Sequence, residues 1–260
     1  MNRNTMKSTV VWVFMACAMI MIAVPEAAAQ SADWEYDLAI YGFLPTIKGE
    51  LNYEVPQLGD TIEVDPDALL DNLEFTAQVA FAARHDRWSV LADVIYLEEA
   101  TSDERRLDVG GGVNLRTSLG LDAWIVSFGG GYEVARSGRS TFGVLAGARY
   151  FSTDNSLSLK ADGPLATDVS VKSSADVWNG FVGVRGMAGL GERSFVPYHL
   201  DVGAGESDFS WQAMTGIGYE WDWGGLVLGY RHLEFDQGDD GTVHELRMSG
   251  GELSAFLFYA

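Results

Sequence analysis

The amino-acid sequence predicts an all-β protein, a closed antiparallel β-barrel of about ten strands that crosses a membrane. Three observations lead to this prediction. Apolar and polar residues alternate along most of the chain after residue 30, as they do in strands with one apolar face. Most alternating segments have the roughly 9–11 residues that a tilted strand needs to cross a bilayer. Short and long connections follow one another in turn, which is typical of transmembrane barrels.

Residues 1–29 are predicted to be a secretory signal peptide, and residues 30–260 a single barrel domain. Arg3 and Lys7 give the segment a positive start, an uncharged apolar run follows, and three alanines end it as a cleavage site. The apolar run is shorter than the roughly 20 residues of a membrane-spanning helix. Cys17, the one cysteine, lies in this segment. The mature chain is therefore expected to have no disulfide and no thiolate chemistry.

Ten segments show the alternation and are predicted as strands, and eight strands is the alternative count. The predicted strands are residues 34–44, 74–84, 88–98, 121–135, 141–152, 177–188, 194–204, 209–221, 225–236 and 247–259. Short turns are expected at residues 85–87, 136–140, 189–193 and 222–224. The other connections are residues 45–73, 99–120, 153–176, 205–208 and 237–246, of which the first three are long.

An even number of strands returns both chain ends to the rim of the short turns. In transmembrane barrels this rim faces the periplasm, so the long loops are expected to be extracellular. Apolar residues mirror one another across residues 110–112 and across residues 162–164. Hairpins are therefore predicted within residues 99–120 and 153–176, projecting above the membrane.

One face of the predicted strands is apolar and carries aromatic residues toward its ends. A soluble barrel, such as a periplasmic binding protein, would place charged residues on its outer face, whereas Tyr and Trp at strand ends are typical of the two membrane interfaces. The predicted aromatic girdle consists of Trp34, Tyr36, Trp88, Tyr96, Trp124, Tyr132, Tyr150, Trp211, Tyr219, Trp221, Tyr230 and Tyr259.

The opposite face is rich in glycine and carries scattered charges. A barrel of about ten strands has a narrow lumen that side chains largely fill. Because an unpaired charge there is costly, the arginines and carboxylates are expected to pair with one another. With Glu35, Glu74 and Glu252 included, carboxylates outnumber arginines, so any conducting path would prefer cations. The predicted luminal ion-pair network consists of Asp37, Arg84, Asp93, Glu133, Arg149, Arg185, Asp201, Glu220 and Arg231.

No catalytic residue is predicted. His199 and Asp201, two apart on the inward face, form the best candidate pair, but they lack an evident serine at matching depth. His232 is expected to face the lipid near the outer girdle. The net charge of −20, from 17 basic and 37 acidic residues, excludes a nucleic-acid-binding protein, because phosphate contacts need clustered Lys and Arg.

No cofactor and no metal ligand is predicted either. Residues 236–245 are acidic and resemble a calcium loop, but Arg247 stands where such a loop needs its closing glutamate. The connection 45–73 carries many carboxylates, which leaves weak binding of divalent cations at the cell surface open.

Five short motifs occur in a characteristic order along the chain. They are LPTIKG at residues 44–49, LDNL at 70–73, WSVLADVIYL at 88–97, LAGARY at 145–150 and LGYRHL at 228–233. In these motifs the chain resembles small bacterial outer-membrane β-barrel proteins, which are mostly without assigned function. Its last strand alternates up to Tyr259 and resembles the signal read by the barrel assembly machinery, although Ala260 follows. The resemblance implies an outer-membrane location, with membrane lipid, lipopolysaccharide and the assembly machinery as partners.

The sequence thus favours a structural or surface-interaction barrel with a largely plugged lumen. A narrow, cation-preferring pore is the first alternative. An outer-membrane hydrolase is the second alternative, and a soluble periplasmic binding barrel is the third.

Overall fold

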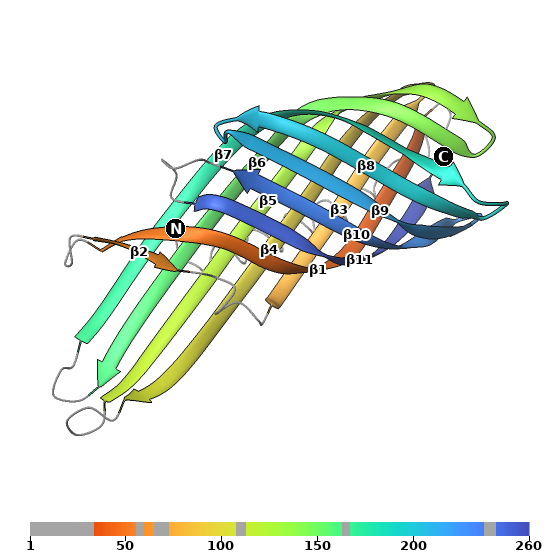
Figure 1. Cartoon of the computed structure of the whole chain (residues 1–260). Coiled ribbons are helices and arrows are strands. Elements are labelled where there is room, and N and C mark those ends of the chain that lie inside the picture. Colours follow the sequence, from red (N-terminus) through yellow and green to blue (C-terminus); the bar gives the residue numbers. More distant parts are fainter. Residues whose placement is uncertain are drawn as a thin grey trace, which may run out of the picture. The chain divides into compact units, whose positions relative to one another are not determined.

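The computed structural model describes residues 34–55, 60–64, 73–107, 113–162, 167–236 and 243–259 (Figure 1). The predicted signal peptide lies outside these residues. Within them, no helix is long and apolar enough to span a membrane. The strands in chain order are β1 (Trp34–Val55), β2 (Asp60–Val64), β3 (Leu73–His85), β4 (Trp88–Leu107), β5 (Val113–Ser137), β6 (Ser140–Asp162), β7 (Thr167–Gly189), β8 (Ser194–Gly205), β9 (Phe209–Trp221), β10 (Gly224–Asp236) and β11 (Val243–Tyr259).

Pairing between β1 and β11 closes the sheet into a barrel. From β3 to β11 each strand pairs with the next one in the chain, and β1 pairs with both β3 and β11. The ring therefore contains ten strands, β1 and β3–β11, which confirms the predicted fold class. The short β2 lies outside this ring and pairs with the far end of β1, where Val55 is opposite Asp60.

The short turns lie on one rim, together with the start of β1 and the end of β11. In the register Tyr36 is opposite Tyr259, and Glu35 forms an ion pair with Arg84 beside the β3–β4 turn. Asp86 in this turn and Gly138 in the β5–β6 turn have left-handed φ angles of 53° and 56°. Two-residue hairpin turns need such angles. The predicted short turns are confirmed, and we call this side of the barrel the turn rim.

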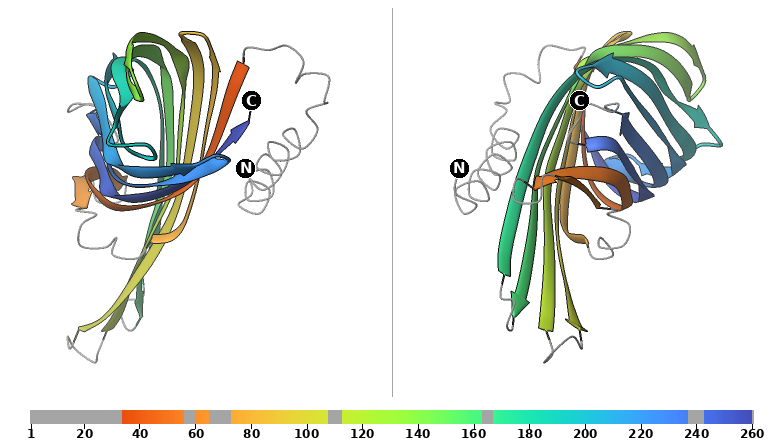
Figure 2. Two further views of the ribbon diagram at one scale, coloured as in Figure 1. Left: turned by 90° about the vertical axis from the view of Figure 1, so that its right-hand side faces the viewer. Right: turned by 60° about the vertical axis from the view of Figure 1, so that its left-hand side comes forward.

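Strands β4 to β7 continue far beyond the rest of the barrel on the opposite side (Figures 1 and 2). β4 and β5 pair up to Leu107 and Val113, and β6 and β7 pair up to Ala161 and Thr167. β5 and β6 also remain paired over this length. We call this four-stranded extension, residues 100–107, 113–120, 156–162 and 167–172, the ridge.

The ridge confirms the two predicted hairpins and corrects the strand boundaries. The segments 99–120 and 153–176 are strand over most of their length, not loop. Their Ser, Thr and Asp residues suggested loops, but these alternate with apolar residues such as Leu157, which is buried. β1 likewise continues through Pro45 to Val55, where a loop was expected.

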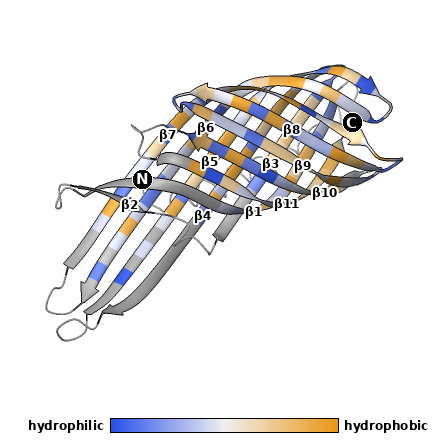
Figure 3. Ribbon diagram, viewed as in Figure 1, coloured by the Kyte–Doolittle hydropathy of each residue, from blue (hydrophilic) through white to orange (hydrophobic). Residues whose placement is uncertain are grey.

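Hydrophobic and hydrophilic residues alternate along the barrel strands (Figure 3). On β10, Leu226, Leu228 and Tyr230 are exposed by 44%, 68% and 54%, whereas the intervening Val227 and the following Arg231 are buried. The exposed positions point outward, and the buried ones point into the lumen. This pattern inverts that of a soluble barrel and suits a lipid environment.

The hydrophobic core lies inside the barrel, on the ridge side of the luminal charges. On β1, β4, β6 and β10 the apolar core residues follow the charged or tyrosyl ones with increasing distance from the turn rim. Phe43 follows Tyr41, Phe151 follows Arg149, and Leu233 follows Arg231. We call this core the apolar seal, and its residues are Phe43, Ile95, Leu97, Leu121, Ala123, Ile125, Phe151, Leu157, Val177, Leu233, Phe235, Leu246 and Met248.

Candidate functional site

The luminal charges below the apolar seal form separate groups, of which the first centres on Arg149 of β6. Its Nη2 donates to Asp201 Oδ2 of β8 at 2.7 Å, and its Nε donates to Ser127 Oγ at 3.0 Å. The side chains of Arg149 and Asp201 are 1% and 0% exposed. His199 Nε2 lies 2.6 Å from the same Asp201 oxygen, and the guanidinium lies 5.0 Å from the centre of the Phe181 ring. This ion pair is completely enclosed.

Glycines make room for this group, as the sequence indicated. A Cβ atom at Gly147 would lie 2.7 Å from Cζ of Phe181, and one at Gly183 would lie 2.7 Å from Cβ of Asp201. Both distances are below van der Waals contact. The absence of a side chain at these two positions lets the neighbouring strands place bulky and charged groups in the lumen.

The second group ties together four strands around Arg231 of β10. Its Nη1 lies 3.0 Å from Asp93 Oδ2 of β4, and its Nε lies 2.8 Å from Glu252 Oε2 of β11. The same Nη1 donates to the Tyr41 hydroxyl of β1 at 3.1 Å, and that hydroxyl donates to Asp93. Arg231 therefore forms ion pairs with two carboxylates, those of Asp93 and Glu252.

The third group lies near the turn rim. Arg84 Nη2 of β3 is 2.8 Å from Asp37 Oδ2 of β1, and its Nε is 3.6 Å from Glu35. Arg185 of β7 faces the same region of the lumen, but within the part of the chain that the structure describes no carboxylate comes within the 4.0 Å of an ion pair.

Two of the predicted network residues pair elsewhere. Glu133 accepts a 2.8 Å hydrogen bond from Arg136 Nε, and Glu220 forms an ion pair with Arg139. Both pairs lie by the turn rim, where Glu133 also lines a small pocket with Arg84 and Arg185 but has its ion pair with Arg136. The sequence did not indicate them because residues 136–140 were expected to form a turn rather than to supply partners.

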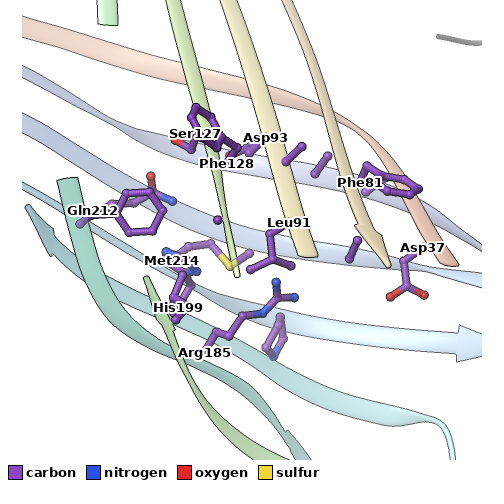
Figure 4. A pocket seen from close by; sticks show the side chains of 18 of the residues that line it. Asp37, Phe81, Leu91, Asp93, Ser127, Phe128, Arg185, His199, Gln212 and Met214 are labelled. Carbon is purple, nitrogen blue, oxygen red and sulfur yellow. The ribbon is translucent and has the colours of Figure 1, made fainter. Parts of the chain in front are cut away.

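A cavity of about 240 Å³ lies in the lumen among these groups (Figure 4). Charged and polar side chains reach it from several strands, and apolar side chains line much of the remainder. Its lining includes Asp37, Leu91, Asp93, Arg185, His199 and Met214. The apolar seal lies between this cavity and the ridge.

The predicted girdle residues occupy outward positions, in two rows. The row near the turn rim contains Tyr36, Trp88, Tyr132, Tyr219 and Trp221. Trp34 is the first residue of β1 and is exposed. The row toward the ridge contains Tyr96, Trp124, Tyr150, Trp211 and Tyr230. Neighbouring rings contact one another, as Trp88 and Tyr132 do at 4.9 Å between centroids.

The aromatic residues of the structure differ from the predicted girdle at Tyr96, Trp178 and Trp223. Tyr96 is only 4% exposed; its ring centroid lies 4.7 Å from that of Trp124, and its hydroxyl lies 3.4 Å from Glu98 Oε2 and from Asp122 Oδ1. Trp178 and Trp223 are exposed outward aromatics that the sequence prediction omitted, since they lie beside or in predicted connections. Tyr259 has an outward register position, and its side chain is outside the described part of the structure.

Polar side chains gather on the outward face of β10 and β11, just beyond Tyr230. His232 Nδ1 lies 2.6 Å from Ser249 Oγ, and its Nε2 lies 3.2 Å from Glu234 Oε2. Arg247 Nε lies 3.2 Å from the same Glu234 oxygen. The Trp211 ring packs on the His232 ring at 4.3 Å. We call Trp211, His232, Glu234, Arg247 and Ser249 the outer polar cluster.

Among the residues that the structure describes, no group of three or more His, Cys, Asp or Glu side chains is arranged to hold a metal ion. The acidic side chains of residues 50–71 and of residues 239–245, considered for calcium or other divalent cations, lie outside the described part. Weak cation binding at these connections stays a prediction.

No family model matches the chain, and no curated protein matches it. Among solved structures it is similar to the outer membrane protease OmpT from Escherichia coli, with 11% identity, a TM-score of 0.45 and coverage of 88% of this chain and 97% of that one. The translocator domain of the autotransporter NalP from Neisseria meningitidis shows 14% identity and a TM-score of 0.37, with 96% and 97% covered. No residue role follows from likenesses this distant. The barrel fold rests on the closed ring itself.

Replacing Arg149 by glutamine is expected to lower the free energy of unfolding by about 3–5 kcal/mol, because Asp201 is left buried without its cationic partner. Urea unfolding of the refolded protein measures this. The double variant R149Q/D201N, which removes both charges, is expected to lose less. A matched change at the exposed pair, Arg136→Gln, is expected to cost at most about 1 kcal/mol. Equal losses in the single and double luminal variants would contradict the pairing.

Proposed function

We propose that this protein is a non-enzymatic outer-membrane barrel with a closed lumen, which presents the ridge at the cell surface. The apolar seal is the observation that carries the proposal. Phe43, Leu97 and Phe151 in it are 0% exposed. The rings of Phe151 and Phe235 stack at 4.9 Å between centroids, from strands on different sides of the barrel. Buried Thr153 and Asn155 lie among the seal residues, opposite Ala123 and Leu121. A closely packed and mostly apolar layer of this kind opposes the passage of hydrated ions.

The outward face supports the outer-membrane location. Between the two aromatic rows the exposed residues of β1, β10 and β11 are mostly apolar, for example Ile40, Leu228 and Leu253. Beyond the row toward the ridge come the carboxylates of Asp122 and Asp176. An apolar band between two aromatic rows is the arrangement that a bilayer and its interfaces favour. Membrane lipid and lipopolysaccharide are then the surroundings of this face.

The ridge supports a surface-interaction role. Its inward face continues the seal through Leu157 and Val171. Its outward face is rich in serine and carries exposed Arg116, Lys160 and Lys172. A long polar sheet anchored on a rigid barrel can present such side chains well above the outer leaflet, where a partner at the cell surface can reach them.

Refolded mature protein is expected to give negligible conductance in planar bilayers, because the seal leaves no hydrated path. The double variant F151A/F235A, which removes the stacked rings, is expected to conduct. The matched variant F142A/F209A removes two outward, exposed phenylalanines that do not line the luminal cavity, and it is expected to remain closed. Stable cation-preferring channels in the unaltered protein would instead support the narrow-pore alternative.

A second candidate function, an outer-membrane hydrolase, rests on the outer polar cluster rather than on His199 and Asp201. Among the described residues, His199 has Asp201 as its hydrogen-bond partner and no hydroxyl group. In the cluster, Ser249, His232 and Glu234 follow one another in the order of nucleophile, base and orienting carboxylate. Their outward position near the membrane interface suits an ester of a membrane lipid as the substrate.

An alkyl fluorophosphonate tests this second function, because it modifies only serines activated by a neighbouring base. If the cluster hydrolyses esters, the reagent is expected to label Ser249, and the label is lost in S249A and strongly reduced in H232Q. The luminal change S254A serves as the matched control and leaves labelling intact. Absence of label in the unaltered protein would contradict the hydrolase and leave the non-enzymatic barrel.

A further inference from the structure

Arg185 differs from the other luminal arginines. Arg84, Arg149 and Arg231 each have a carboxylate oxygen within 3.0 Å. In the described part of the chain Arg185 has neither an ion pair nor a hydrogen bond, although Asp37 and Asp93 lie near enough to attract it electrostatically. A cation in such a confined place normally acquires an anionic partner or water.

The guanidinium of Arg185 extends into the luminal cavity toward Leu91, with His199 and Met214 close by (Figure 4). The cavity volume of about 240 Å³ is large enough for several water molecules or for a small organic molecule. Leu91, Leu145 and Met214 supply apolar lining. The cavity therefore contains one guanidinium group without an ion-pair partner in the described part of the chain, beside an apolar wall.

We propose that this cavity binds a small organic monocarboxylate, whose carboxylate pairs with Arg185 and whose apolar part contacts Leu91 and Met214. The planar guanidinium matches a carboxylate through two parallel hydrogen bonds. Asp37 and Asp93 remain near and disfavour a second negative charge on the ligand, which argues against phosphate. The apolar wall favours a ligand with a hydrocarbon part.

The ligand enters from the turn rim. Arg185 also lines a smaller pocket of about 60 Å³, together with Arg84, Arg87 and Glu133 beside the short turns. On the other side the apolar seal closes the cavity. If the turn rim is periplasmic, the site samples periplasmic solutes. The inference goes beyond the surface role of the ridge and does not depend on it.

Benzoate, a monocarboxylate of suitable size, is the probe. Benzoate is titrated into refolded mature protein in detergent, and the heat of binding is measured by calorimetry. Saturable binding at one site is expected. In R185Q the affinity is expected to fall about tenfold or more, because a charge-assisted bidentate contact is lost. The matched variant R193Q removes an exposed arginine by the turn rim that lines neither pocket, and it is expected to bind benzoate as the unaltered protein does.

A second variant distinguishes the contribution of the cavity from that of the Arg185 charge. L91F/M214F keeps Arg185 but fills the cavity, and it is expected to abolish benzoate binding. The heat-dependent gel mobility of closed barrels verifies that each variant has folded. Three results would overturn the proposal: no saturable binding to the unaltered protein, equal affinity in R185Q, or competition by inorganic phosphate at lower concentration than benzoate needs.

Discussion

The closure of the sheet between β1 and β11 is the constraint on which the rest of the structure depends. Pairing runs from Tyr36 opposite Tyr259 to Leu51 opposite Val243, so that the two edge strands satisfy each other's backbone groups. A membrane offers no water for unpaired N–H and C=O groups, and closure is the way in which a sheet avoids them. Closure also fixes a narrow lumen, and every inward side chain must fit within it.

The lumen meets this demand with two layers of different chemistry. Arg149 and Arg231 lie with their carboxylates on the side of the turn rim, and residues such as Phe151 and Leu233 lie next to them on the ridge side. The apolar layer lowers the local dielectric, which strengthens the ion pairs and makes an unpaired charge costly. Arg185, which has no ion pair among the described residues, is therefore the luminal arginine that most needs an anionic partner.

The period-two alternation was sufficient to predict the barrel, its strand count and the inward direction of Arg149, Asp201 and Arg231. It did not reveal which charges meet, because partners such as Arg231 and Asp93 are 138 residues apart and their heights depend on the register between strands. The sequence predicted the two hairpins of the ridge but not that they are continuous with the barrel strands. Serine and aspartate in segment 153–176 are typical of loops, and only the strand pairing shows that these residues are in a sheet. The apolar seal could not be located, because alternation gives direction but not depth.

The two-sided accessibility of a luminal thiol tests the closed lumen most directly. The predicted mature chain contains no cysteine, so Ala80→Cys, an inward position that lines the cavity, introduces a single thiol. The protein is inserted in one orientation into liposomes, and a charged thiosulfonate reagent is added on either side. The account predicts modification from the side of the turn rim and protection from the side of the ridge. Equal modification rates from both sides would contradict it.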